Sequence, residues 1–487
     1  MASPRALVAT SSPIHGLPRR QLPLMPVFAQ SVAAVAPSGA AAVIPALVLA
    51  SVGGGGAIAA FAAAAVVVLL VSACLRPMAQ RMSAVGGIYS YTARGLGPLV
   101  AVPTGWSAII GYGAVGMAGL IAVGTYLCNI MVSLGVTSGI PTAAIIAVLI
   151  GASVIATAIM VRGIRVSAWI TLLIECISIA LLAVLFVLVL VTTLRHGTPV
   201  RAAMTWTSGT QNLAVGVVVA VSAFVGFESS TTLSGEARQP FRSVPLTIRW
   251  TPVIAGVLYM ASVTVLAIAL HGAPSSVQHS STPFVALLAA QHATALSAIL
   301  DLGIAASFFA CTVASINALV RVLFCMGREG VAPSVLGRTH PRFKTPAPAI
   351  IASMVVVTTA PIVVLVAGTK PHDGLLIFLT LSACGYLGTY LSGCIAAPIL
   401  LRRIGESTLG GAVLSALTTT ILLVLFGNAI YFAWRDGAVL LSVYGALLAV
   451  SVLYTIGLRF LAPQRLSAVG IYDETQRGDL LDSVPFR

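Results

Sequence analysis

The sequence predicts an all-α polytopic membrane protein with twelve transmembrane helices. Three observations support this prediction. Only 8% of the 487 residues are charged, whereas a soluble domain uses about 25% charged residues to cover its surface. Apolar runs of about 20 residues, long enough to cross the hydrocarbon core of a bilayer, recur along the whole chain. The basic residues are distributed between the connections as a membrane topology requires.

The apolar runs define a membrane domain over residues 27–461. A tail of residues 1–26 precedes it, and a polar tail of residues 462–487 follows it. The first tail lacks the apolar core and cleavage site of a signal peptide, so we expect it to remain in the cytoplasm. The twelve expected spans are 27–50, 53–75, 99–128, 142–161, 167–193, 213–234, 251–270, 297–324, 349–368, 374–401, 411–434 and 438–461.

The basic residues set the orientation. With the N-terminus in the cytoplasm, only Arg195, Arg201, Lys370 and Arg435 of the 26 Lys and Arg residues lie outside. This positive-inside distribution supports an even number of spans, and it predicts that both termini lie on the cytoplasmic side of a plasma or inner membrane. Because the basic residues follow the topology and form no single face, the net charge of +14 does not indicate a nucleic-acid partner.

The motifs that would mark a cofactor, a metal site or a pore are missing from the sequence. No GxxxxGK[ST] stretch occurs, and no connection is long enough for a nucleotide-binding domain, so we expect no use of ATP. The seven cysteines lie in spans or at their inner ends without metal-ligand spacing, and the seven histidines are scattered. A channel would need a repeated pore lining or charged rings. These observations disfavour an enzyme or a channel and leave a gradient or an exchange as the energy source.

Two of the expected spans are interrupted near their middle. Span 27–50 contains Pro37-Ser38-Gly39, and span 213–234 contains Gly226 followed by Glu228. Proline removes a helical hydrogen bond, and glycine accepts backbone angles outside the helix. In lipid such breaks survive only where protein or a polar cavity satisfies the freed groups.

The two interruptions occupy matching positions. Each stands first in a block of five spans, 1–5 and 6–10, and an odd number of spans inverts the second block; two further spans follow. Paired broken helices in inverted repeats mark the midplane binding site of many secondary transporters. The alternative is that Pro37 only kinks its helix and that Gly226 only allows two helices to pack closely.

Three acidic residues fall within expected spans: Glu175, Glu228 and Asp301. An ionised carboxylate at mid-bilayer costs about 2.5–3.5 kcal/mol on insertion scales, so each should face a cavity or be protonated. We expect Glu228, and as a second candidate Glu175, to gain and lose a proton during function. The alternative is a protonated carboxyl that links two helices through a hydrogen bond. We expect Asp301 to be interfacial.

Several motifs resemble those of the amino acid–polyamine–organocation (APC) superfamily of permeases, over residues 27 to 400. They are APSGA at 36–40, GGIYSYTARGLGP at 86–98, FVGFES at 224–229, MGREGVAP at 326–333 and HPRFKTPAPAI at 340–350. The resemblance implies a ten-helix inverted-repeat core whose spans 1 and 6 unwind at the membrane centre. It also implies that backbone groups there hold an α-amino acid.

Residue by residue, the resemblance implies two sets of backbone contacts. The amides of Ser38, Gly39 and Ala40 would bind the substrate carboxylate. The carbonyls of Ala223, Phe224 and Gly226 would bind its ammonium group, with the Phe224 ring as a gate. Tyr112, Ser307 and Asn317 could also line the site, although ordinary helix packing explains each equally well.

The sequence departs from the family pattern at three positions. Ser83 replaces a usual proline, Gly235 a common acid, and Ser178 a lysine that proton-coupled relatives often carry. Taken together, the broken spans, the embedded acids and the resemblance predict secondary active transport of amino acids or related amines by alternating access, with proton symport. The alternative is an exchanger or exporter of another small amine or metabolite in the same fold.

Overall fold

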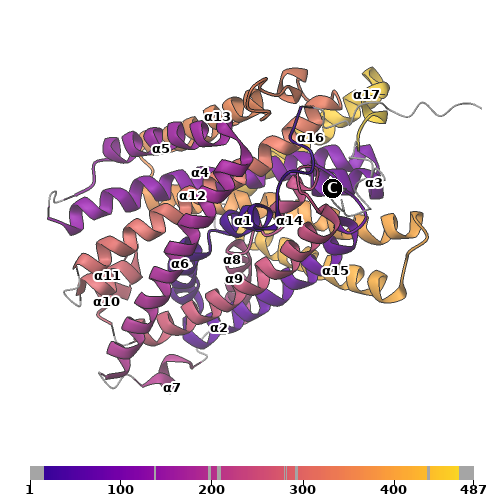
Figure 1. The fold of residues 1–487 in the computed structure, drawn as a ribbon. Coiled ribbons are helices and arrows are strands. Elements are labelled where there is room, and N and C mark those ends of the chain that lie inside the picture. Colours follow the sequence, from indigo (N-terminus) through magenta and orange to yellow (C-terminus); the bar gives the residue numbers. More distant parts are fainter. Residues whose placement is uncertain are drawn as a thin grey trace, which may run out of the picture.

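All secondary-structure elements of more than one residue in the described part of the chain are helices (Figure 1). A single isolated parallel bridge, between Leu22 and Ala237, was found outside them. The computed structural model describes residues 16–470 apart from 136–138, 196–198, 206–209, 272, 279, 281, 291–293 and 436–438. Most of the two expected tails, residues 1–15 and 471–487, therefore lies outside the described residues. The all-α prediction is confirmed.

Ten helical stretches of the described chain are long and apolar enough to cross a membrane. The first, Leu24–Ala79, consists of α1 (Leu24–Val35) and α2 (Pro37–Ala79). The others are α4 (Pro98–Ser133), α5 (Thr142–Arg162), α6 (Ile164–Arg195), α9 (Pro240–His271), α12 (Thr294–Arg328), α13 (Ala347–Val366), α14 (Pro371–Arg403), α15 (Leu409–Arg435) and α16 (Val439–Leu461). This number and composition make the chain an integral, multi-pass membrane protein.

The ten stretches differ from the twelve expected spans at two places. Expected spans 27–50 and 53–75 both lie in Leu24–Ala79. Expected span 213–234 begins as the short apolar helix α8 (Thr210–Ser222) and ends in a 3-10 helix, η1 (Ser229–Leu233). Each of the remaining expected spans overlaps one long helix.

The chain turns sharply inside α2 at Gly53, where φ is 72° and ψ is 177°. Glycine adopts this conformation without the steric cost that a side chain would add. The next residue, Gly54, packs so closely on α7 (Val200–Ala203) that a Cβ would lie 1.8 Å from the Ala203 carbonyl oxygen. The two halves of α2 therefore run as separate helices on either side of this turn.

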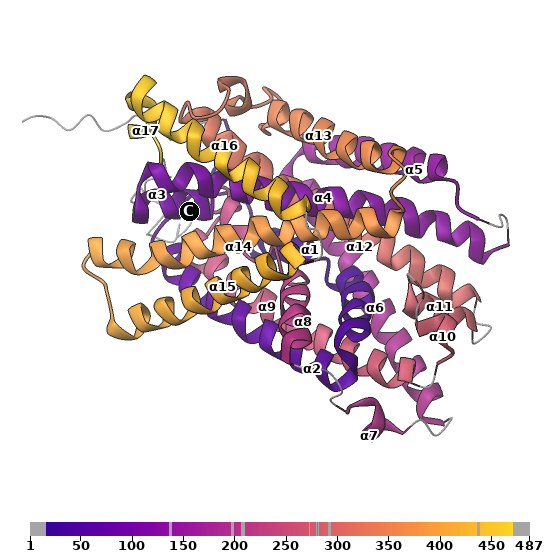
Figure 2. The ribbon, with the colours of Figure 1, turned by 180° about the vertical axis from the view of Figure 1, so that it is seen from behind.

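The broken segments lie inside the bundle. Both views place α1 and α8 in its middle (Figures 1 and 2). Around them α12 packs against α4, and α2 packs against α9 and α8. Helices α15 and α16 lie on the face that Figure 2 shows in front. The remaining short helices are α3 (Ile88–Leu96), α10 (Ser275–Gln278), α11 (Pro283–Ala290), η2 (Ser334–Gly337) and α17 (Pro463–Ser467).

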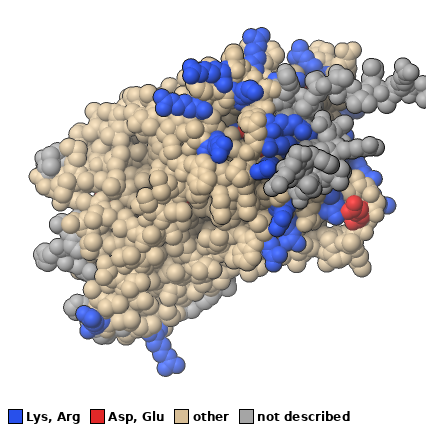
Figure 3. Space-filling view, in the orientation of Figure 1, with Lys and Arg blue, Asp and Glu red and all other residues tan. Residues whose placement is uncertain are grey.

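The charged side chains are distributed unevenly over the surface. In the face shown in Figure 3, most Lys and Arg side chains gather toward the end of the molecule that carries α3 and α17 in Figure 1. The long middle of this face is almost free of charge. An uncharged band with a basic end is the surface expected of a protein that sits in a bilayer.

Candidate functional site

The first break lies between α1 and α2. Ala36 adopts the left-handed conformation, with φ 47° and ψ 57°, and Pro37 begins the next helix. A residue other than glycine pays about 1–2 kcal/mol for this conformation. Proline fits the first turn of a helix because its missing N–H would have no helical partner there. The expected interruption of the first span is thus found, at Ala36-Pro37.

The second break begins where α8 ends, at Ser222, and continues through turns to η1. Gly226 has a φ of 93°, and a Cβ at this position would lie 3.1 Å from the Ala34 carbonyl oxygen in α1. This close approach requires glycine. It brings the break of the α8–η1 segment into direct contact with the end of α1, so the two interruptions form one region.

The three residues expected to bind a carboxylate are buried at the start of α2. The Gly39 N–H donates to Ser307 Oγ at 3.1 Å, and the Ala40 N–H donates to the Ala36 carbonyl at 2.8 Å. The Ser38 hydroxyl donates to Glu175 Oε2 at 3.2 Å. In this conformation the Gly39 and Ala40 amides are therefore satisfied within the protein.

The residues expected to bind an ammonium group contact α9 and α14. The Tyr259 hydroxyl of α9 donates to the Ala223 carbonyl at 2.7 Å and lies 3.3 Å from the Val35 carbonyl. The fully buried Phe224 ring packs edge-on against the Tyr259 ring, with centroids 4.9 Å apart. Tyr259 thus touches both broken segments.

Glu228 is completely buried and is held by two tyrosines. The Tyr112 hydroxyl of α4 donates to Oε1 at 2.8 Å, and the Tyr390 hydroxyl of α14 donates to Oε2 at 2.5 Å. The Tyr390 oxygen in turn accepts the Gly226 N–H at 3.3 Å. Within the described residues no cation pairs with Glu228. Its partners are neutral hydroxyl groups.

Glu175 of α6 occupies the other side of the first break and is also buried. In addition to Ser38, the Ser307 hydroxyl of α12 donates to it, at 2.8 Å from Oε1. Ser307 therefore links Glu175 to the Gly39 amide. Both embedded glutamates lie beside a helix break, each with two hydroxyl donors.

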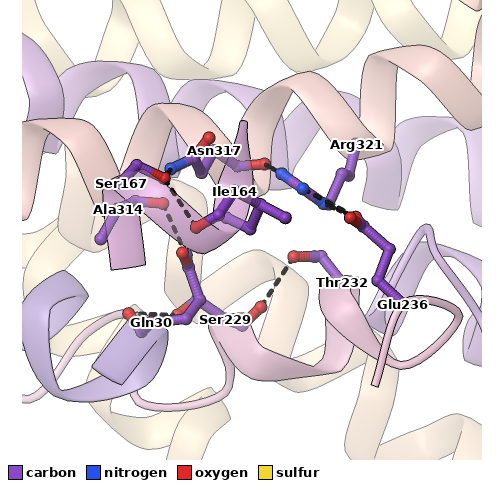
Figure 4. Close-up of polar contacts among 9 residues, drawn as sticks. All are labelled: Gln30, Ile164, Ser167, Ser229, Thr232, Glu236, Ala314, Asn317 and Arg321. Atoms are coloured by element: carbon purple, nitrogen blue, oxygen red, sulfur yellow. Dashed lines mark hydrogen bonds and ion pairs between the residues drawn. The ribbon is translucent and has the colours of Figure 1, made fainter. Parts of the chain in front are cut away.

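A second polar cluster lies next to the breaks (Figure 4). Glu236 and Arg321 form a buried ion pair of 2.7 Å, and Arg321 also donates to the Asn317 carbonyl at 2.8 Å. The Asn317 amide donates to Ser167 Oγ at 3.1 Å, and the Gln30 amide donates to the Ala314 carbonyl at 2.6 Å. This cluster ties α12 to α1, to the start of α6 and to the loop that follows η1.

Sequence reasoning found some of these residues and missed others. Ser307 and Tyr112 were among its candidates, whereas Tyr259, Tyr390 and the Glu236–Arg321 pair were not. Tyrosines in apolar spans carry no local signal of a polar role. Asp301, which was expected to be interfacial, is fully buried against the rest of the protein, and its depth in the membrane stays a prediction. No group of His, Cys, Asp and Glu large enough for a metal ion occurs among the described residues.

Comparison with known proteins assigns the chain to a family. The family model described as amino acid permease matches residues 30–458. A methylthioribose transporter of Bacillus subtilis is 26% identical over 56% of this chain and 60% of its own length. The low-affinity putrescine importer PlaP of Escherichia coli is 24% identical over 55% of this chain and 59% of its own. Cationic amino acid transporter 4 of Mus musculus is 25% identical over 56% of this chain and 44% of its own length. The matches thus span less than two thirds of these relatives.

Proposed function

Since the chain belongs to the amino acid permease family, we propose that it is a secondary active transporter of amino acids or related amines. The proposal includes alternating access in the cell membrane and coupling to protons. The observation that carries it is the meeting of two broken helices beside two buried glutamates. Similar proteins bear names with different substrates, among them putrescine and cationic amino acids, so the proposal keeps the class of substrate broad.

The backbone at the two breaks suits a zwitterion. A helix N-terminus, as at Ser38–Ala40, favours an anion, and the C-terminal end of a helix, as at Ala223, Phe224 and Gly226, favours a cation. A substrate carboxylate would replace Ser307 as the partner of the Gly39 amide. A substrate ammonium would replace the Tyr259 hydroxyl at the Ala223 carbonyl. Both exchanges leave the backbone groups satisfied, which lowers the cost of emptying and filling the site.

Proton coupling is assigned to Glu228 and, second, to Glu175. A carboxylate without a cation is costly in a buried site, whereas its protonated form is not. Each group is held by hydroxyls, which can donate to a carboxylate or accept from a carboxylic acid. A proton taken up at Glu228 would therefore change the energy of the residues that bridge the two breaks.

The proposed topology has twelve crossings and cytoplasmic termini. The half of α2 before Gly53 belongs to the first span together with α1, and the half after Gly53 is the second span. Helix α8 and η1 together form the sixth span. Five spans from α1 and five from α8 then form the inverted repeats, and α15 and α16 are the two additional spans.

Uptake by purified protein in proteoliposomes tests this function. We expect saturable uptake of an amino acid or amine that increases with an inward proton gradient. Uptake that depends on substrate inside the vesicles, but not on the gradient, would favour the alternative of an exchanger. Flux that rises linearly with concentration would contradict a carrier.

A paired glycine substitution tests the site. A Cβ at Gly39 would lie 3.0 Å from the Phe308 ring and 3.3 Å from Ser307 Oγ, whereas a Cβ at Gly151 meets no atom within 4 Å. Gly39→Val should abolish uptake while Gly151→Val leaves it unchanged, with both variants expressed at wild-type level. Normal uptake by Gly39→Val would place the carboxylate site elsewhere.

A further inference from the structure

An apolar groove of about 680 Å³ lies between α5 and α13. These helices run side by side in both views (Figures 1 and 2). The groove is lined by exposed aliphatic side chains, among them Val154, Ile351 and Val355. Its lining on α5 extends from Ile150 to Arg162, a rise of about 18 Å at 1.5 Å per residue. This length is a little more than half of the roughly 30 Å hydrocarbon core, so the groove spans one leaflet.

A second cavity, of about 230 Å³, begins where the groove ends. Arg162 and Phe343 line both of them. Arg165, Arg342 and Lys344 also line the cavity. The apolar groove thus leads directly into a polar cavity with a strong positive charge.

The charge of this cavity is not compensated within the described residues. None of Arg162, Arg165, Arg342 and Lys344 forms a salt bridge there. The acid among the lining residues, Glu236, is already paired with Arg321, which lines the same cavity. Four cations therefore face a site that lacks a counter-charge from this part of the chain.

We infer that the groove and the cavity together bind one anionic phospholipid. Its phosphate group lies among Arg162, Arg165, Arg342 and Lys344, and one acyl chain lies between α5 and α13. Lys and Arg side chains near the membrane surface attract anionic headgroups, and basic pockets between transmembrane helices on the cytoplasmic side bind such headgroups. A soluble anion or a soluble protein would leave the apolar groove unused, whereas a phospholipid fills the groove and the basic cavity together.

The site adjoins the segment before α1. The backbone amides of Gln21 and Leu22 both donate to the Glu236 carbonyl at 2.8 Å, and both residues line the cavity. A lipid phosphate in the cavity therefore contacts residues that hold this segment against the loop after η1. Bound lipid stabilises this arrangement because a ligand of the folded state raises its stability.

Thermal unfolding of the purified protein in detergent tests the site. We expect phosphatidylglycerol, but not phosphatidylcholine, to raise the melting temperature. The fourfold variant R162Q/R165Q/R342Q/K344Q should bind phosphatidylglycerol about tenfold or more weakly. A control variant, R242Q/R249Q/R402Q/R459Q, removes the same charge from exposed positions elsewhere and should keep the wild-type shift.

Two further arms separate a lipid from a free anion. Val154→Trp fills the groove without a change of charge and should also remove the shift, which keeps the test valid should the fourfold variant fail to fold. Inorganic phosphate at the same concentration should produce no shift in the wild-type protein. The inference is overturned if phosphate acts as strongly as the lipid, if the Trp variant keeps the shift, or if the control variant loses it.

Discussion

Glu228 and Glu236 are equally buried, yet the protein satisfies them in opposite ways. Glu228 accepts hydrogen bonds from two tyrosines of α4 and α14. Glu236 forms an ion pair with Arg321 of α12. Neutralisation of a carboxylate paired with arginine removes the attraction between the two groups and leaves the arginine charge without its partner. A carboxylate among hydroxyls keeps hydrogen-bond partners in either form.

Burial alone does not define the role of an acid in this bundle. The partners decide it. Glu236 belongs to the cluster that joins α12, α1 and the loop after η1, where a fixed charge gives a firm connection (Figure 4). Glu228 lies two residues beyond Gly226, beside the contact of the two breaks. A change of charge at Glu228 would therefore act where the chain is least regular.

The largest expected effect is the loss of the ion pair. Arg321→Gln leaves the Glu236 carboxylate buried without its cation, which should lower the free energy of unfolding by about 3–5 kcal/mol. Denaturant unfolding in detergent measures it. The double variant Glu236→Gln/Arg321→Gln should recover part of this loss, and the exposed control Arg242→Gln should stay within about 0.5 kcal/mol of wild type. A double variant no more stable than Arg321→Gln would show that the pair is not the cause.

A smaller effect is expected at the tyrosines. Tyr390→Phe removes a donor to Glu228 and the acceptor of the Gly226 amide, so it should destabilise the protein by about 1–3 kcal/mol. Tyr112→Phe removes one hydrogen bond to the same carboxyl and should cost about 0.5–1.5 kcal/mol. The melting temperatures of the two variants, each compared with wild type, show which substitution destabilises the protein more. Equal losses would argue that Tyr390 does not support the second break.

The smallest effect on stability, but the most specific effect on function, is expected for Glu228→Gln. The amide keeps the shape of the side chain and has no charge to lose, so stability should change by about 1 kcal/mol or less. Uptake by this variant should no longer vary with pH, while substrate binding persists. Initial uptake rates between pH 5 and 8, with the double variant Glu236→Gln/Arg321→Gln for comparison, measure this. If the wild-type pH profile remains, Glu228 is structural, and Glu175→Gln is the next variant to compare.

Local features of the sequence determined the class of the protein and the positions of its breaks. Apolar runs predict helices in lipid wherever they occur, because every backbone group must be satisfied there. Pro37 and Gly226 act on their own backbone, so the breaks appear within a few residues of their expected places. The turn at Gly53 falls where the expected spans 27–50 and 53–75 meet, and the next residue, Gly54, packs against Ala203. The break before the 3-10 segment holds Gly226 against Ala34, a contact between distant parts of the chain that local features do not specify.

The tertiary structure alone decided which side chains meet. Tyr112 and Tyr390 lie 116 and 162 residues from Glu228 in the sequence, and Arg321 lies 85 residues from Glu236. The rotation of each helix about its axis selects these partners, and hydrophobic runs that are apolar on all sides do not specify that rotation. For the same reason the burial of Asp301 could not be read from its place in the span. The sequence therefore determined where polar groups enter the membrane, and the packing of the helices determined how each one is satisfied.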